Sequence, residues 1–333
     1  MTDDESMTLL VTGGAGYIGS HTVRQLRALG RQVVVLDSLV NGHRQAVLDA
    51  PLVVGDTADA DLVTKVVTEY GCTALIHFAA HKAAGESMHA PAKYFANNTA
   101  GSLTLFEAAR NAGVRHVVFS STAAVYGTPD TVPIPETAPL RPENPYGESK
   151  LMVERILHWL GVAHDLRSVC LRYFNAAGAS FDTVIGEDWT ITANLVPVAL
   201  KSTLERGPRL TVLGTDYPTP DGSAIRDYIH VDDLADAHLK ALDYLEAGGD
   251  STTVNLGTGV GSSVFEVIRT LEEVSGVMVP FTTGPRRAGD AIILTADNSR
   301  AAEVLGWKPV YQLADILDTA WRWHSTHLDG YSD

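Results

Sequence analysis

A tyrosine and a lysine stand four residues apart in the segment NPYGESK, at Tyr146 and Lys150. A helix through this segment would place both side chains on one face, one turn apart. A free phenol has a pKa of about 10, and a nearby ammonium group lowers it by favouring the phenolate. We therefore predict that Tyr146 is a general base and that Lys150, together with the positive ring of a bound cofactor, lowers its pKa. The alternative is a surface helix on which neither residue has a chemical role.

Hydroxyl side chains stand at the end of the apolar segment at residues 116–120 and directly after it. They are Ser120, Ser121 and Thr122. In α/β proteins with a parallel sheet, ligands bind at the carboxyl ends of the strands. Thr122 is therefore predicted to hydrogen-bond the phenol and a reacting substrate oxygen. The alternative is an ordinary hydroxyl-capped turn after a strand.

The glycines of the segment TGGAGYIG, at Gly13, Gly16 and Gly19, stand between a predicted strand and a predicted helix. Such a loop lets the backbone approach a pyrophosphate and directs helix N–H groups at it. Asp37 ends the next strand, where a carboxylate accepts from ribose hydroxyls and repels a 2′-phosphate, which favours NAD over NADP. Asp56 ends the third strand and is a candidate acceptor for the adenine amino group. The alternatives are a tight turn for the glycines and caps or turns for the two aspartates.

The elements that would position these residues follow a regular alternation in the first half of the chain. Apolar β-branched runs alternate with amphipathic stretches, which predicts an α/β fold with a doubly wound parallel sheet of the Rossmann type. The expected strands are residues 8–12, 32–37, 51–56, 74–78, 116–120 and 168–172, and the expected helices are residues 17–29, 58–70, 98–112 and 146–160.

After about residue 178, glycines, prolines and short strands mix with helices. We predict a dinucleotide-binding domain over residues 7–178 and a second, smaller α/β substrate-binding lobe over residues 179–333, with chain crossings between them. In the second part, the expected strands are residues 210–214, 253–256 and 279–281, and the expected helices are residues 262–275 and 313–324.

Composition excludes several classes of partner. The 333 residues are 45% hydrophobic and carry a net charge of −15, which predicts a packed globule and argues against nucleic acid or an anionic membrane as a partner. The apolar runs are too short to span a bilayer, and the acidic first residues do not resemble a signal peptide. Cys72 and Cys170 are predicted to be buried and reduced, as in a cytoplasmic protein. The 12 histidines do not cluster at ligand spacing, so no metal site is predicted.

The glycine loop, the strand-end hydroxyl and the Tyr-x-x-x-Lys pair jointly resemble the extended short-chain dehydrogenase/reductase family. The resemblance runs from Leu10 to Trp323, and its most specific segments are HFAAHKAAGES, RYFNAAGA, LGTDYPTPDGSAIRDYIHVDDLADAH and RRAGD. Within the family, these segments are similar to epimerases of UDP-hexoses. The resemblance implies an NAD-dependent isomerase that interconverts UDP-galactose and UDP-glucose by transient oxidation at C4, through a 4-keto intermediate.

The resemblance also implies a set of cofactor contacts. They cover the pyrophosphate, the adenosine ribose, the adenine and the nicotinamide of NAD. The residues implied are Gly13, Gly16, Tyr17, Ile18, Gly19, Asp37, Ser38, Asn41, Gly42, Asp56, Thr57, Phe78, Ala79, Lys82, Asn97, Tyr146, Lys150 and Phe174.

A second implied set would bind the UDP-hexose. Arg226 and Arg287 would meet the phosphates, which suits paired guanidinium chemistry, although a surface ion pair is the alternative. Leu294 is intermediate in size between the residues found there in relatives, so acceptance of N-acetylated sugars stays open. The residues implied are Lys82, Thr122, Tyr146, Asn175, Asn194, Leu195, Leu213, Arg226, Arg287, Asp290 and Leu294.

Three other activities share parts of this pattern. A dehydratase needs an acidic pair directly after the strand-end hydroxyl, where this chain has Ala123 and Ala124. A sensor that binds NAD without chemistry needs the loop but not the Tyr–Lys pair. Another NAD-dependent sugar-nucleotide epimerase, including one for N-acetylhexosamines, remains an alternative. By resemblance, the helices near 98–112 and 146–160 would pair across the two-fold axis of a homodimer.

Overall fold

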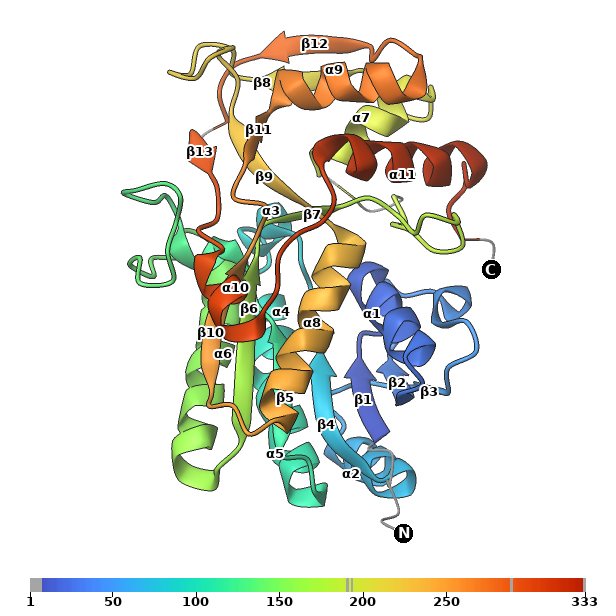
Figure 1. Cartoon of the computed structure of the whole chain (residues 1–333), viewed down its shortest axis with the longest axis vertical. Helices are drawn as coiled ribbons and strands as arrows, with labels where there is room; N and C mark the ends of the chain where they lie inside the picture. The colour runs from blue at the N-terminus through green and yellow to red at the C-terminus, as the bar shows by residue number, and fades with distance from the viewer. Residues whose placement is uncertain (1–7, 190–191, 193, 288–289, 332–333) are drawn as a thin grey trace.

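The computed structural model describes residues 8–189, 192, 194–287 and 290–331 (Figure 1). The predicted domain limits at residues 7 and 333 and the centre of the RRAGD segment, residues 288–289, lie outside this part of the chain. Of the described helices, none is long and apolar enough to cross a membrane.

A seven-stranded sheet forms the centre of the molecule, and every neighbouring pair in it is parallel. The strand order β10-β6-β5-β4-β1-β2-β3 contains the order of a dinucleotide-binding fold, extended at one edge by β10. This confirms the predicted doubly wound α/β fold. The strands are β1 (Thr8–Thr12), β2 (Gln32–Asp37), β3 (Leu52–Val54), β4 (Cys72–His77), β5 (His116–Ser120), β6 (Arg167–Tyr173) and β10 (Thr252–Leu256).

Helices cover both faces of this sheet because alternate strand residues point to opposite sides. One face packs against α1 (Tyr17–Ala28), α8 (Val231–Glu246) and α10 (Ser299–Leu305). Figure 1 shows α1 and α8 side by side on that face. The opposite face packs against α2 (Ala60–Tyr70), α5 (Ser102–Ala112) and α6 (Pro145–His164). Cys72 and Cys170 are buried free cysteines in the second of these cores, as predicted.

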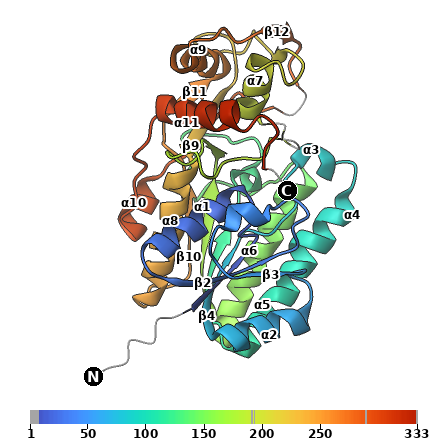
Figure 2. The ribbon, with the colours of Figure 1, turned by 90° about the vertical axis from the view of Figure 1, so that its right-hand side faces the viewer.

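The second part of the molecule lies beyond the carboxyl ends of the sheet strands (Figure 2). Its short strands form a mixed sheet, in which β7 and β13 run parallel to β9 and β11 runs antiparallel, and a separate parallel pair. Its elements are β7 (Asn175–Ala177), α7 (Leu195–Thr203), β8 (Leu210–Leu213), β9 (Ile225–His230), β11 (Gly261–Ser263), α9 (Val264–Ser275), β12 (Phe281–Gly284), β13 (Ile293–Leu294) and α11 (Leu313–Thr326).

The chain crosses between the two parts more than once. After β9 it returns to the large sheet, where α8 covers one face and β10 pairs with β6. It then goes back to form β11, α9 and β12 before α10 packs on α8. Residues 231–256 therefore belong to the sheet that carries the glycine loop, although they follow residue 179.

The helix that carries the Tyr–Lys pair has clear end signals. Asn144 caps α6 by accepting a hydrogen bond from the Gly147 backbone N–H at 2.9 Å, and Pro145 occupies the first turn. The expected helix at 98–112 differs from the structure. It divides into η2 (Phe95–Gly101), which has π-type hydrogen bonding, and α5, which begins at Ser102. The expected strand at 279–281 begins only at Phe281.

The remaining short elements connect the sheet to its loops. They are η1 (Arg44–Val47), α3 (Ala84–Ser87), α4 (Pro91–Tyr94) and η3 (Ala123–Tyr126). The π-type segment η2 has a local cause: Asn98 turns inward and its side-chain amide bonds the His81 backbone and the Ser149 hydroxyl. This contact fastens the loop after β4 to α6.

Candidate functional site

The loop between β1 and α1 has no room for side chains at two of its glycines. A Cβ at Gly13 would lie 2.5 Å from the backbone nitrogen of Ala79, and Gly13 has φ +73°. A Cβ at Gly19 would lie 2.2 Å from the Gly13 carbonyl oxygen. These close approaches require glycine and leave a backbone surface on which a ligand can lie.

The N-terminus of α1 is a suitable site for an anion. Its N-cap, Gly16, has no side-chain capping hydrogen bond, and the first turn contains no acidic residue. The first N–H groups and the positive end of the helix dipole therefore face the loop without a side-chain partner. Tyr17 and Ile18 begin this helix, and the Tyr17 hydroxyl donates to the Gly178 carbonyl oxygen at 2.6 Å. These features fit the pyrophosphate of a dinucleotide.

Asp37 ends β2 beside this loop and is almost fully buried. One carboxylate oxygen accepts from the Ala15 N–H at 2.9 Å, and the other accepts from the Leu39 N–H at 2.8 Å. A Cβ at Gly42 would come within 2.9 Å of the carboxylate, so the following turn lies directly against it. Each oxygen keeps a further lone pair for a ribose hydroxyl. Ser38 and Asn41, the polar side chains of this turn, are exposed.

At the end of β3, Asp56 is exposed and accepts from the Ala58 N–H at 2.9 Å, with half-buried Thr57 beside it. The turn role that sequence reasoning left open for Asp56 is thus present in the structure. An exposed carboxylate with a free oxygen remains available to a ligand.

Tyr146, Lys150 and Thr122 come together at the carboxyl end of β5. All three side chains are buried, with exposed fractions of 9%, 3% and 7%. The Lys150 ammonium donates to the Ser120 carbonyl oxygen at 2.9 Å and lies 4.8 Å from the centre of the Phe119 ring. The Thr122 hydroxyl accepts from the Ala124 N–H at 3.2 Å, so the turn role left open for it is present, and its interaction with the Tyr146 phenol acts to lower the pKa of that phenol. The helix therefore aims both of its residues at the strand-end hydroxyl run, as their spacing predicted.

In the chain alone, burial dominates the electrostatics of this group. Burial raises the pKa of Tyr146, and the hydrogen bond from Thr122 only partly opposes this. Burial also lowers the pKa of Lys150 to about 7, while the carboxylate of Glu154 acts to raise it. In the chain by itself the pKa of Tyr146 is therefore raised, because loss of solvent, together with Tyr173 and Tyr94 nearby, outweighs the hydrogen bond from Thr122. Formation of the phenolate needs a further positive charge at this position.

The loop after β4 carries the residues implied on the nicotinamide side. Phe78 and Ala79 are half-buried, and the Phe78 ring packs on the buried His238 ring at 4.5 Å between centres. Lys82 is exposed, with its ammonium 3.5 Å from the Glu187 carboxylate. Asn97 is also exposed and donates to Asn98 at 2.9 Å.

Phe174, also implied at the cofactor, is buried directly after β6 in a small core with Leu151 and Ala296. Its backbone N–H donates to the Leu256 carbonyl oxygen at 3.1 Å. The ring thus lies between α6 and the strand system of the second part, close in sequence to Asn175 on β7.

A second polar cluster forms in the other lobe. The Asp290 carboxylate lies 2.6 Å from the Arg287 guanidinium and 3.7 Å from that of Arg226. Arg226 is mostly buried, and burial lowers its pKa, whereas Arg287 is mostly exposed. Leu294 on β13 is in register with Arg226 on β9 and is half-buried. Two guanidinium groups close to one carboxylate leave an excess of positive charge for a diphosphate.

The other implied substrate residues are more dispersed. Asn175 is half-buried, Asn194 is the exposed N-cap of α7, and Leu195 begins that helix. Leu213 ends β8 with a 37% exposed side chain. They come from β7, α7 and β8, and they lie in the second part of the molecule.

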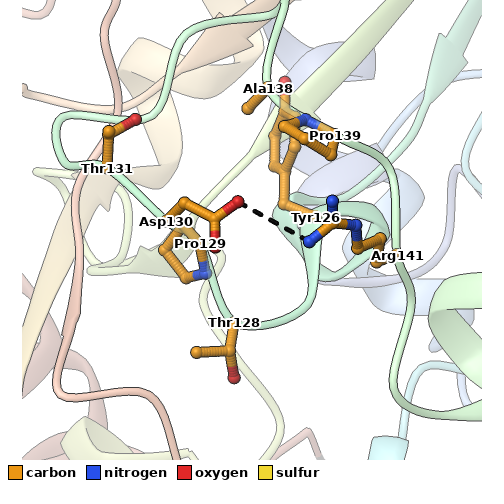
Figure 3. A pocket seen from close by; sticks show the side chains of 8 residues that line it. All are labelled: Tyr126, Thr128, Pro129, Asp130, Thr131, Ala138, Pro139 and Arg141. Atoms are coloured by element: carbon orange, nitrogen blue, oxygen red, sulfur yellow. Dashed lines mark ion pairs between the residues drawn. The ribbon is translucent and has the colours of Figure 1, made fainter.

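A small pocket lies away from these groups, in the loop after η3 (Figure 3). Its cavity of about 20 Å³ has room for a water molecule but not for a sugar or nucleotide. The Arg141 guanidinium points across it to Asp130 at 3.6 Å. In the described residues, no group of three or more His, Cys, Asp or Glu side chains is arranged to hold a metal ion.

Comparison with known proteins agrees with this geometry. Residues 9–257 match the model of the NAD dependent epimerase/dehydratase family. The chain belongs to that family. Its sequence is 50% identical over 329 residues to a UDP-glucose 4-epimerase of Lacticaseibacillus casei, covering 98% of this chain and 99% of the relative.

Solved structures of the epimerase/dehydratase family match over the same length. A UDP-glucose-4-epimerase from Stenotrophomonas maltophila with bound NAD and formylated UDP-arabinopyranose has a TM-score of 0.94 and 42% identity, covering 96% of this chain and 98% of that one. The UDP-glucose 4-epimerase of Bifidobacterium longum in complex with NAD⁺ and UDP has a TM-score of 0.92 and 38% identity, covering 98% and 100%.

Some contacts around the epimerase/dehydratase site had no signal in the sequence. The His43 ring stacks on Tyr331 at 4.7 Å, and the Tyr331 hydroxyl bonds both the N–H and the carbonyl of Gly186. Glu187 is the buried partner of Lys82. These contacts join residues far apart in the chain at positions without periodicity or motif. Only the folded structure reveals them.

Proposed function

We propose that this chain is an NAD-dependent UDP-glucose 4-epimerase, an isomerase that interconverts UDP-galactose and UDP-glucose. One observation carries the proposal: a buried Tyr146–Thr122–Lys150 group and a glycine loop both follow carboxyl ends of strands of one parallel sheet, in a chain 50% identical along its length to such an enzyme. Neither the glycine loop nor the identity alone would select inversion at C4. A base directed at the hydroxyl and a bound NAD together permit oxidation at C4, and the likeness to UDP-glucose 4-epimerases favours inversion as the outcome.

The loop and β2 are proposed to hold NAD. The backbone at Gly13 to Gly19 and the open N-terminus of α1 would bind the pyrophosphate, and Asp37 would accept from the adenosine ribose. When bound, NAD supplies the hydride acceptor and donor for C4 of the sugar and adds positive charge next to Tyr146.

The chain's own residues then move the proton. Tyr146 takes the proton from the sugar 4-hydroxyl and later returns it, while Thr122 holds the phenol and the sugar oxygen in line. Lys150 supplies an ammonium charge that favours the phenolate without leaving the site, because the Ser120 carbonyl fixes its nitrogen. C4 passes through the ketone and regains a hydroxyl on the opposite face.

The second polar cluster is proposed to hold the UDP portion. Arg226 and Arg287 would bind the diphosphate, Asp290 the ribose and Leu213 one face of uracil. These contacts are independent of which sugar face meets the base. The 4-keto sugar can therefore turn over while its nucleotide stays bound.

The test is incubation of the purified protein with UDP-glucose, UDP-galactose and their N-acetyl forms, without added reductant, followed by separation of the products. Interconversion of the first two supports the proposal. A 6-deoxy-4-keto product would instead identify a dehydratase, which Ala123 and Ala124 disfavour. Conversion of the N-acetyl forms alone would assign the alternative substrate class. The size of Leu294 is the feature that bears on that choice.

We also propose a cytoplasmic homodimer. Leu103 on α5 and Trp159 and Val162 on α6 expose 43%, 66% and 66% of their apolar side chains on the helices implied at the two-fold axis. Exposed apolar side chains on neighbouring helices favour burial against a second copy. Light scattering of the wild type and of Trp159→Glu tests this, since only the variant should be a monomer.

A further inference from the structure

A buried ion pair lies directly behind the catalytic lysine. Glu154 is one helical turn beyond Lys150 on α6, just as Lys150 is one turn beyond Tyr146. Its carboxylate is bound by Arg172 from β6, with Nε at 3.0 Å from one oxygen and Nη2 at 2.5 Å from the other. Both side chains are buried, with 7% and 5% exposed. This is a bidentate pair in a place where an unpaired charge would be costly.

The pair is connected to the strand end that carries Thr122. Glu154 Oε1 also accepts from the Ser121 hydroxyl at 2.5 Å, and Ser121 lies between Ser120 and Thr122. On the other side, Arg172 Nη1 donates to the Tyr126 hydroxyl at 2.9 Å. The Arg172 guanidinium thus bonds Glu154 on one side and Tyr126 on the other. Each oxygen of the Glu154 carboxylate accepts at least one hydrogen bond.

This arrangement settles which partner Lys150 has. The ammonium donates to the Ser120 carbonyl oxygen rather than to Glu154, although Glu154 is one turn away on the same helix. An ammonium and a carboxylate at this spacing ordinarily attract one another. If Arg172 were lost, Lys150 would be the nearest cation able to compensate the buried carboxylate.

We propose that Arg172 and Glu154 are positioning residues for the epimerase reaction: Arg172 neutralises Glu154 and holds it on Ser121, so that Lys150 stays on the Ser120 carbonyl and faces Tyr146. The inference rests on the proposed function, because it assigns the pair a role through Lys150. It explains why a strong ion pair is buried here, where two apolar side chains of similar size would serve stability equally well.

The surroundings of Lys150 allow the effect to be read by titration. The titratable and charged side chains around Lys150 and Tyr146 are Glu154 on α6, His77 on β4, Arg172 and Tyr173 on β6 and Tyr94 on α4. Burial keeps His77 neutral above a pKa of about 3. Glu154 and Arg172 are therefore the charges of this group that can redirect the lysine at neutral pH.

The experiment compares wild type, Arg172→Met, and the double variant Arg172→Met/Glu154→Gln. Two readouts are used: kcat and KM for UDP-galactose, and the pH midpoint of Tyr146 ionisation, taken as tyrosinate absorbance of each protein minus that of its Tyr146→Phe form. Arg172→Met should lower kcat about tenfold or more with KM within about twofold, and should raise the tyrosinate midpoint. The double variant should regain most of the lost kcat, and its tyrosinate midpoint should return toward that of wild type, since no buried carboxylate remains to attract Lys150.

A double variant as impaired as Arg172→Met would overturn the proposal, as would an unchanged tyrosinate midpoint in Arg172→Met. If Arg172→Met does not fold, Ser121→Ala decides: it should lower kcat several-fold at unchanged KM, and an unchanged kcat would also overturn the proposal. Ser168→Ala, a buried serine near the start of β6, is the matched control and should leave kcat unchanged. Wild type without epimerase turnover would refute the proposed function instead, while the tyrosinate readout would still test the pair.

Discussion

Arg226 and Asp290 face each other at 3.7 Å, from β9 and from the segment before β13. Their exposed fractions are similar, at 15% and 16%, so the carboxylate is held next to a guanidinium in a partly desolvated place. Arg287, which lies 2.6 Å from the same carboxylate, is 65% exposed. The two arginines therefore should not contribute equally to nucleotide binding.

Replacing these arginines by methionine tests the difference. Arg226→Met should raise KM for UDP-galactose by about 10- to 100-fold, because a desolvated hydrogen bond to a charged group contributes about 1.5–3 kcal/mol. Arg287→Met should raise it less, since solvent screens an exposed pair. Steady-state kinetics measure both, and kcat serves as the control because the cluster does not contact C4. Equal KM effects would contradict the proposed division.

Removing the phenol of Tyr146 should abolish most turnover. Tyr146→Phe is expected to lower kcat by about 10²- to 10⁴-fold, the usual contribution of a positioned base. NAD content per chain should be unchanged, because the loop and Asp37 are intact. The matched control is Tyr94→Phe, whose ring lies 6.5 Å from that of Tyr146 and whose hydroxyl bonds Ala83 instead. A comparable loss of kcat in the two variants would contradict the assignment of Tyr146 as the base.

Asp37 is predicted to select NAD over NADP. Asp37→Ala should relax the preference, but it also removes the acceptor for the Ala15 N–H. Asp37→Asn is the sharper variant, since its amide oxygen can still accept that hydrogen bond while the negative charge is gone. Both variants should bind NADP more tightly relative to NAD, as measured by competition in the purified apoprotein. A ratio unchanged in both would exclude the ribose role.

Buried histidines should make the fold sensitive to acid. Burial lowers the pKa of His238 to about 4, whereas an unfolded histidine has a pKa of about 6.5. The unfolded state therefore binds the proton first, so stability present above pH 6.5 is lost as the pH falls toward 4. Between pH 6.5 and 5, protonation of this one residue in the unfolded state should lower the free energy of unfolding by about 2 kcal/mol. Urea unfolding of wild type and His238→Met should converge over that range, and the exposed His158→Gln should follow wild type.

The strand and helix pattern of the large sheet was predictable because each element has its own local signal. β1, β2, β4, β5 and β6 each contain a short run rich in apolar residues, and α6 has Asn144 and Pro145 at its start. The Tyr–Lys pair and the glycine loop were predictable for the same reason. Their functions require a fixed spacing within one element.

Contacts between distant segments were not predictable. The π-type segment η2 forms because Asn98 bonds His81 and Ser149, and neither contact is visible from periodicity. The depth at which Tyr146 lies was not predictable either, and in the chain alone burial raises its pKa. The Glu154–Arg172 pair likewise joins a helix face to a strand that only the folded sheet brings together.

The return of the chain to the large sheet has a consequence for its synthesis. On the ribosome, residues 8–173 emerge with the edge of β6 unpaired and with the apolar face beneath α8 open to water. Such an edge readily recruits other strands. The nascent chain therefore needs protection until residue 256 has left the exit tunnel, and a fragment cut at residue 178 should aggregate rather than serve as a separable nucleotide-binding module.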